Sequence, residues 1–200
     1  MKKIIEVTGV AGVGKSFVID RLMLQNSNII LDSDVIKRYK LSDLYLFYLF
    51  FKTKRSFSNF LNILKISLFL NMGVFDRLNF IRNSIKKIGK DYFLEHIFNE
   101  NKIVLVDEGI SHLYQNIISP NRQNDRYLTR LVDKIISNLN FSRDIIVVDA
   151  PFEVVYERLK QRGHKRVLLK DLKPFIKKSK EQIFRLKRRF PKITEIENGV

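Results

Sequence analysis

An apolar run, a glycine-rich octapeptide and a helical pattern follow one another at the start of the chain. Residues 3–8 read as a buried strand, and the next eight residues are Gly9-Val10-Ala11-Gly12-Val13-Gly14-Lys15-Ser16. Residues 16–24 then have the apolar spacing of a helix. A buried strand that turns tightly into a helix is a unit of a parallel α/β sheet, so this segment constrains the fold class strongly.

The octapeptide matches the pattern G-x-x-x-x-G-K-[ST], which binds phosphate. Its glycines let backbone N–H groups curl round phosphate oxygens, and the helix that begins near Lys15 adds its positive end. Lys15 would bridge the β and γ phosphates, and the Ser16 hydroxyl would ligate Mg²⁺. An ordinary glycine-rich turn is the alternative, which the strand before it and the helix after it disfavour. We therefore expect nucleotide contacts from Gly9, Gly12, Val13, Gly14, Lys15, Ser16 and Phe17.

Two further apolar runs end in carboxylates. Asp32 and Asp34 follow the short run 28–31, and Asp107 and Glu108 close the run 103–106. Ligands of α/β sheets bind beyond the carboxyl ends of the strands, so these acids are predicted beside the glycine-rich loop. We expect Asp32 and Asp107 to help hold Mg²⁺, and Asp34 or Glu108 to accept the proton of an attacking hydroxyl. The alternatives are a helix N-cap by Ser33 or Asp34 and polar strand ends without a further role.

Three arginines follow a fourth apolar run that ends at Asp149. Arg158 and Arg162 are four residues apart on a predicted helix over 152–162, Gly163 ends that helix, and Arg166 lies just beyond it. Guanidinium groups clamp phosphoryl oxygens bidentately and stack on adenine. We expect residues 158–170 to form an arginine-rich lid, and a solvated basic face is the alternative.

The rest of the chain fits the same architecture. Residues 41–98 are predicted to be all-helical, with breaks at Gly73 and Gly89. An amphipathic helix is predicted from Leu128 to Leu139, a basic helix over 172–190 and a short last strand over 193–196. Strands that alternate with helices indicate a parallel sheet.

The helical region also contains the most apolar stretches of the chain. Residues 44–51 are too few to span a membrane, and residues 57–75 are interrupted by polar residues and glycine. In the second stretch Phe57, Leu61 and Leu68 share one helix face with Phe60 and Leu64. We expect this face to be core or pocket wall, and an interfacial membrane helix or an oligomer seam is the alternative.

Composition narrows the classes of protein. The 200 residues include no cysteine, which excludes disulfide scaffolds, cysteine-ligated zinc and thiol nucleophiles, and we expect a cytoplasmic location. The net charge of +16 is typical of proteins that meet polyanions. Residues 158–200 hold 15 Lys+Arg against 4 Asp+Glu, so the excess lies mainly in the predicted lid and the basic helix.

In the order of its motifs the whole chain resembles the P-loop nucleoside, nucleotide and small-molecule kinases of the adenylate-kinase-like superfamily. Asp32-Ser33-Asp34 before a helix, and Arg166-Val167-Leu168-Leu169, are similar to shikimate kinases, which have proline where Val167 stands. The stretch from Asp107 to Gln115 resembles thymidylate kinases, in which an arginine that contacts the acceptor phosphate occupies the position of Glu108. The end of the chain, residues 193–198, is similar to their last strand and adenine-side loop.

This resemblance implies a single domain over residues 1–200 with a P-loop parallel sheet, a helical acceptor region at about 41–98 and the lid. It implies ATP and Mg²⁺, with the γ-phosphoryl group moving to a nucleoside, a nucleotide or a hydroxyl-bearing metabolite. Lys15, Arg162 and Arg166 would neutralise the transferred group, and Arg158 and Arg162 would contact the nucleotide. A P-loop NTPase associated with nucleic acid or another polyanion is the alternative function. We expect no transmembrane segment, and homodimerisation is left open.

Overall fold

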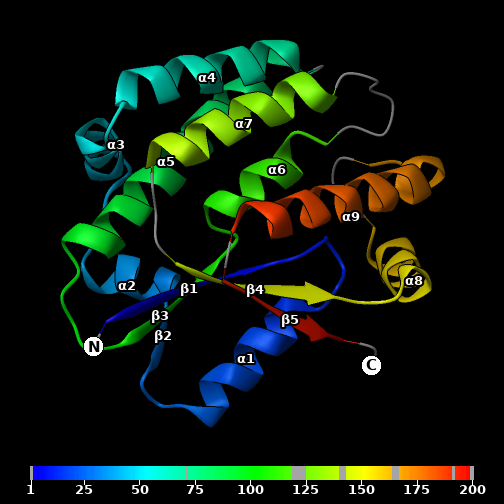
Figure 1. Ribbon diagram of the computed structural model, residues 1–200, viewed down its shortest axis with the longest axis horizontal. Coiled ribbons are helices and arrows are strands. Elements are labelled where there is room, and N and C mark those ends of the chain that lie inside the picture. Colours follow the sequence, from blue (N-terminus) through cyan, green and yellow to red (C-terminus); the bar gives the residue numbers. More distant parts are fainter. Residues whose placement is uncertain are drawn as a thin grey trace.

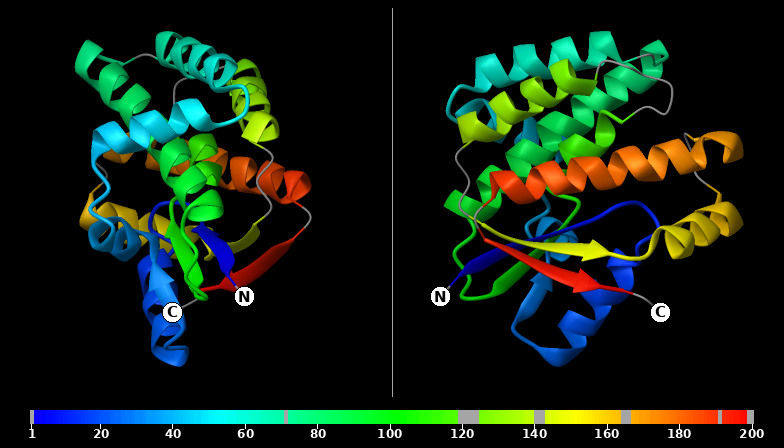
Figure 2. Two further views of the ribbon diagram at one scale, coloured as in Figure 1. Left: turned by 90° about the vertical axis from the view of Figure 1, so that its left-hand side faces the viewer. Right: turned by 45° about the vertical axis from the view of Figure 1, so that its right-hand side comes forward.

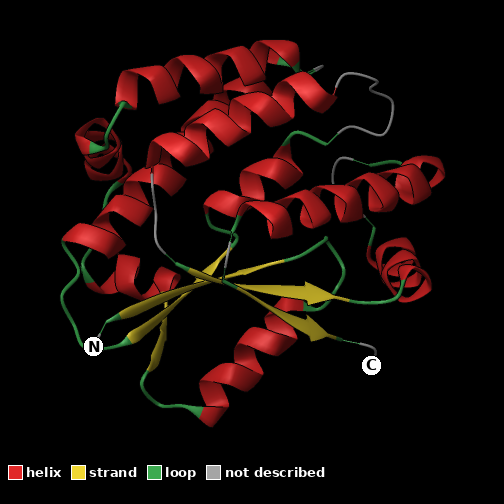
Figure 3. Ribbon diagram, viewed as in Figure 1, coloured by secondary structure: helices red, strands yellow, loops and turns green. Residues whose placement is uncertain are grey.

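Five parallel strands form the centre of the molecule, which we describe from a computed structural model. The structure describes residues 2–70, 72–118, 125–139, 143–163, 167–190 and 192–198. The strand order is β2-β3-β1-β4-β5, and every neighbouring pair is parallel (Figure 3). The strands are β1 (Lys3–Thr8), β2 (Ile29–Leu31), β3 (Ile103–Asp107), β4 (Asp144–Asp149) and β5 (Ile193–Glu197). The predicted α/β fold with a parallel sheet is therefore confirmed.

Helices cover both faces of the sheet, which explains why its strands read as nearly continuous apolar runs. In Figures 1 and 2, α1 lies on one side of the sheet, whereas α4, α7 and α9 lie on the other. Alternate residues of β3 enter two core clusters, Leu105 the larger and Val104 and Val106 the smaller. The α-helices are α1 (Lys15–Gln25), α2 (Asp32–Arg38), α3 (Asp43–Lys52), α4 (Ser56–Phe69), α5 (Val74–His96), α6 (Leu113–Asn116), α7 (Asp125–Leu139), α8 (Phe152–Arg162) and α9 (Leu172–Arg189). Short 3-10 helices cover Ile110–His112 and Leu169–Asp171.

Residues 41–98 form the predicted helical region as α3, α4 and α5, but one of its two predicted breaks is wrong. Gly73 is the N-cap of α5, as a break there requires. Gly89 lies inside α5, where it is buried against α3. A Cβ atom on Gly89 would lie 2.0 Å from the carbonyl oxygen of Leu46, so glycine is needed for close helix packing and not for a turn.

The helix cap considered for the acidic segment after β2 is also not observed. Helix α2 begins at Asp32 itself, and its N-cap residue is Leu31. Ser33 and Asp34 are already helical, so neither caps α2. Asp32 and Asp34 instead place negative charge in the first turn, where the helix dipole favours it.

The predicted apolar face of α4 is core only in part, because Phe60 packs against the larger core cluster whereas Phe57, Leu61 and Leu68 are exposed. Phe57 is 69% exposed and Leu68 is 66% exposed, while Asn59 on the inner side is completely buried. Of the described helices, none is both long and apolar enough to cross a membrane.

Several cations of the basic helix α9 are used inside the molecule. The Lys180 ammonium donates to Asp149 Oδ1 at 2.8 Å and to the carbonyl of Ala150 at 2.6 Å. Lys187 pairs with Glu195 at 2.6 Å, and Arg185 donates to the Thr129 hydroxyl at 3.3 Å. The charge of α9 therefore partly serves to hold that helix against β4, β5 and α7.

Candidate active site

The loop between β1 and α1 has the geometry that its glycines suggested. Gly12 and Gly14 both have φ of +88°, a left-handed conformation that favours glycine. A Cβ atom on Gly14 would lie 2.2 Å from Asn198 Nδ2, and one on Gly9 would lie 2.3 Å from the carbonyl oxygen of Val148. Gly14 is the N-cap of α1 and has no side-chain cap, so the first N–H groups of α1 are available to an anion.

This loop forms one wall of a cavity of about 800 Å³, within the size range of small-molecule sites. Most of the residues predicted to bind nucleotide or to react line it, together with three that were not predicted. The lining residues are Ala11, Gly12, Gly14, Lys15, Ser16, Phe17, Asp107, Glu108, Arg158, Gln161, Arg162 and Asn198. Gly9 and Val13 support the loop from behind, where both are buried.

Lys15 lies largely inside this cavity, with 11% of its side chain exposed. Its ammonium donates to the carbonyl oxygen of Gly9 at 3.3 Å and lies 3.4 Å from Glu108 Oε1. Both partners are oxygens, the kind of atom that a phosphate would present in their place. The lysine is thus held beside the glycine-rich loop by weak contacts that a ligand phosphate can replace.

Glu108 is held at the same point by a second chain of polar contacts. His112 Nε2 lies 3.4 Å from Glu108 Oε1, and Lys87 Nζ on α5 lies 3.2 Å from His112 Nδ1. Because a charged Lys87 only donates, His112 Nδ1 then accepts and Nε2 carries the ring proton toward Glu108. Burial raises the pKa of the Glu108 carboxyl, but His112, Lys15 and Lys87 together hold that pKa below its usual value. Glu108 is therefore ionised at neutral pH.

Asp107 and Ser16 offer hard oxygen donors in the same cavity. Burial, followed by the neighbouring charge of Glu108, raises the pKa of the Asp107 carboxyl. One carboxylate and one hydroxyl are a donor set that suits Mg²⁺, which takes few protein ligands and completes its shell with phosphates and water. The residues present therefore fit the metal predicted from the sequence.

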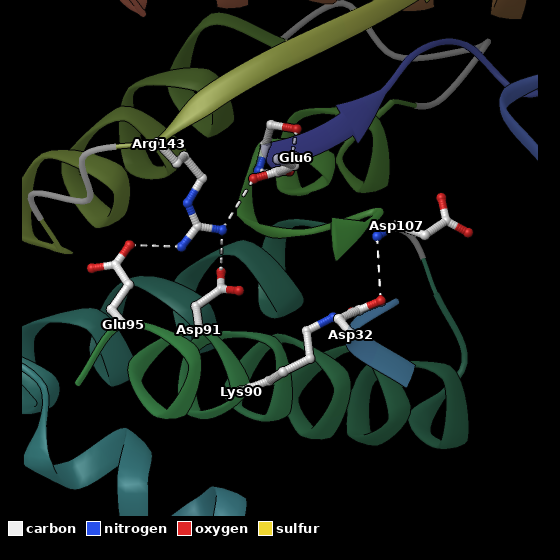
Figure 4. Close-up of polar contacts among 8 residues, drawn as sticks. Glu6, Asp32, Lys90, Asp91, Glu95, Asp107 and Arg143 are labelled. Atoms are coloured by element: carbon white, nitrogen blue, oxygen red, sulfur yellow. Dashed lines mark hydrogen bonds and ion pairs between the residues drawn. The ribbon is translucent and has the colours of Figure 1, made fainter. Parts of the chain in front are cut away.

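Asp32 and Asp34 do not line the cavity in the part of the chain that the structure describes. Asp32 is buried, and its carboxylate accepts one hydrogen bond from the Lys90 ammonium and another, of 3.4 Å, from the Asp107 N–H (Figure 4). Asp34 is half-exposed on α2, 3.9 Å from Lys37. The structure thus separates the two predicted acidic pairs: Asp107 and Glu108 face the cavity, whereas Asp32 supports β3 from behind.

Helix α8 brings two of the three predicted arginines to the cavity. Arg158 and Arg162 both line it, and Arg158 Nη1 donates to the carbonyl oxygen of Gly12 at 3.4 Å. Gly163 ends α8 with φ of +74°, as the sequence predicted. Arg166 lies outside the described residues, so its predicted role stays a prediction.

A buried charge cluster between β1 and α5 was missed by sequence reasoning. Arg143 lies 3.4 Å from Glu6, 3.2 Å from Asp91 and 2.9 Å from Glu95, and the three carboxylates converge on its guanidinium (Figure 4). Burial raises the pKa of Glu6, while its partners Arg143 and Ser111 act in the opposite direction. Glu6 could have been noticed as a charged residue in the middle of an apolar strand, but nothing local identifies its partner 137 residues away.

Comparison with known proteins places this geometry in a known fold. No protein family and no curated protein matches the sequence. Among solved structures, a thymidylate kinase from Candida albicans is similar to all of this chain over 85% of its own length, with a TM-score of 0.52. The chain shares the fold of thymidylate kinase. Because the two sequences are only 14% identical, the likeness concerns the fold alone.

Proposed function

We propose that this protein is a single-domain ATP-dependent phosphotransferase that moves the γ-phosphoryl group of ATP to a small-molecule acceptor. One observation carries the proposal: the glycine-rich loop with Lys15, the carboxylates Asp107 and Glu108, and the α8 arginines line one cavity. Phosphoryl transfer depends on positioning and charge neutralisation, and this set of groups supplies both. The thymidylate kinase fold is consistent with it.

The cations of the cavity would bind and neutralise the phosphates. Backbone N–H groups of the loop and the N-terminus of α1 would hold the phosphate chain, and Lys15 would exchange its contacts with Gly9 and Glu108 for phosphate oxygens. Arg158 and Arg162 face the same space from α8, where they would stabilise charge that develops on the transferred group. Ser16 and Asp107 would hold Mg²⁺, which supplies further charge neutralisation when bound.

Glu108 is our proposed base, with Asp34 the less favoured candidate. Glu108 faces the cavity next to Lys15, whereas Asp34 lies outside it. As the acceptor oxygen bonds to the γ-phosphorus, the bond from that phosphorus to its bridging oxygen breaks and ADP leaves. Where the acceptor reacts through a hydroxyl group, the proton of that hydroxyl passes to the Glu108 carboxylate, which Lys87 and His112 hold in place. The acceptor is a nucleoside, a nucleotide or a hydroxyl-bearing metabolite.

The direct test is transfer of labelled γ-phosphate from Mg-ATP to a panel of nucleosides, nucleoside monophosphates and hydroxylated metabolites. Lys15→Ala should lower turnover about 10²–10³-fold, since one group that stabilises transition-state charge contributes roughly 3–4 kcal/mol. Lys160→Ala is the matched control, because Lys160 lies exposed on α8 and outside the cavity. Unfolding midpoints of both variants would exclude loss of fold as the cause.

Two outcomes would overturn the proposal. A wild type that neither binds Mg-ATP nor phosphorylates any acceptor would exclude it, as would full activity of Lys15→Ala. ATP hydrolysis that requires single- or double-stranded nucleic acid and falls steeply with salt would instead support the alternative NTPase function.

A further inference from the structure

Helix α4 buries polar side chains beside Ile63 and Ile66 on its inner side, and it exposes large apolar side chains on its outer side. Asn59, Asn62 and Ser67 are buried, and Asn138 of α7 donates to Asn59 Oδ1 at 2.8 Å. Phe57, Leu61 and Leu68, one helical stripe on the opposite side, are exposed. A helix that only meets water on its outer side is expected to carry polar side chains there. The outer side of α4 therefore has the composition of a surface that is covered when the protein works.

Large apolar side chains are also exposed on α3 and α5, two of the helices that contact α4. Leu44 and Phe51 are exposed on α3, and Phe75 on α5 is 83% exposed. Helices α3, α4 and α5 contact one another pairwise and lie together at the end of the molecule away from α1 (Figure 2). We call the exposed side chains of Leu44, Phe51, Phe57, Leu61, Leu68 and Phe75 the outer apolar face. So many large exposed apolar side chains on adjoining helices mark an interaction surface.

The positive charge of the helices that carry the outer apolar face indicates an anionic partner. Residues 40–86 contain eight lysines and arginines but only two aspartates. Lys65 lies on the apolar stripe between Leu61 and Leu68, and it is exposed. Asp43 is already paired with Arg82 and with Lys86. If a second copy covered this face through a two-fold axis, cations would oppose cations, which costs free energy.

We propose that the outer apolar face binds the surface of a membrane rich in anionic lipid. Phenylalanine and leucine side chains would enter the boundary between headgroups and acyl chains, and the surrounding lysines and arginines would meet lipid phosphates. The apolar helices would lie in the plane of the membrane, so this mode of binding needs no membrane-spanning helix. The inference rests on α3–α5 alone and does not depend on the proposed catalytic function.

Cosedimentation with two kinds of vesicle tests this directly: one of phosphatidylcholine alone and one that contains about 30% phosphatidylglycerol. Wild-type protein should bind the anionic vesicles at low salt and bind less well at high salt. Phe57→Ser combined with Leu61→Ser should lower the partition coefficient roughly tenfold or more, through loss of buried apolar area. Lys65→Glu should lower it less and only on anionic vesicles.

The matched control is Phe184→Ser combined with Leu24→Ser, which removes one exposed phenylalanine and one exposed leucine from α9 and α1. This pair should leave binding unchanged, and thermal unfolding would show that every variant is folded. Three results would overturn the inference: no binding of wild-type protein, equal loss in the control pair, or a wild-type dimer that the Phe57/Leu61 pair converts to monomer. The last result would assign the face to a second copy of the chain.

Discussion

Glu108 has a backbone φ of +52°, a conformation that costs a residue with a side chain about 1 kcal/mol or more relative to glycine. The same residue is in contact with Lys15 and His112 at the end of β3. The carboxylate thus stands at a position where stability alone would favour glycine.

We predict that Glu108→Gly and Glu108→Ala differ in stability although both lack the carboxylate. Glycine relieves the left-handed strain and alanine does not, so Glu108→Gly should be about 1 kcal/mol more stable than Glu108→Ala. Both should lose most phosphoryl transfer if Glu108 is the base. Urea unfolding and the transfer assay measure the two effects, and equal stability of the two variants would show that the turn is unstrained.

Arg143 provides the second test at this scale, because it is the cation on which three buried or half-buried carboxylates converge. Arg143→Met should destabilise the protein by about 3–5 kcal/mol, since it leaves uncompensated negative charge inside. Arg130→Met, on the exposed side of α7, is the control and should change little.

The loss in Arg143→Met should depend on pH with a definite sign. Burial already raises the pKa of Glu6, and removal of the guanidinium raises it further. A carboxyl whose folded pKa lies above its unfolded value stabilises the fold below the unfolded pKa, and this is lost as pH rises through the folded pKa. Relative to wild type, the variant should therefore be less impaired at pH 5 than at pH 8. A pH-independent difference in urea unfolding would contradict this.

At the scale of helices, the crossing of α3 and α5 depends on a single missing side chain. Gly89 sits in the interior of α5, where glycine lowers helix stability by about 1 kcal/mol relative to alanine. Glycine at this position allows α3 to pack closely, because the Leu46 carbonyl of α3 occupies the space that a Cβ atom would need.

Gly89→Ala should consequently destabilise the protein by roughly 1–3 kcal/mol despite the better helix propensity of alanine. Gly73→Ala is the control, because a Cβ atom there would find its nearest neighbour at 3.9 Å. Denaturant unfolding would measure both. An increase in stability of Gly89→Ala would mean that α3 and α5 can separate freely.

At the scale of the molecule, Asn198 after β5 lines the same cavity as the glycine-rich loop that follows β1. Asn198 Nδ2 donates to the carbonyl oxygen of Val13 at 2.8 Å, and the Asn198 N–H donates to Asp149 at 2.7 Å. The glycine-rich loop is thus fixed from β5, 185 residues away in sequence. This contact follows from the sheet order, in which β4 lies between β1 and β5.

Asn198→Ala should weaken ATP binding about fivefold, the effect of one hydrogen bond of about 1 kcal/mol that holds the loop. Calorimetric titration would measure it, with Asn79→Ala on the exposed side of α5 as control. Unchanged affinity would show that the loop keeps its form without β5.

Local patterns were sufficient to predict the strands, most helices and the glycine-rich loop. Periodicity and glycine geometry act over a few residues, so β1, the loop over 9–16 and the end of α8 at Gly163 match the prediction. The exposure of α4 could not be read in this way, because an apolar stripe looks the same whether it meets core, lipid or water.

The sequence by itself determined the parallel α/β fold and the presence of carboxylates beyond its strands, because both follow from residue order along each strand. Only the tertiary structure decided which carboxylate reaches Lys15. Lys90, 58 residues from Asp32 in sequence, pairs with that acid, while the turn after β3 directs Glu108 into the cavity. The position of each carboxylate depends on contacts between segments that are distant in sequence. Sheet order and helix crossing determine these contacts, and no local sequence pattern reveals them.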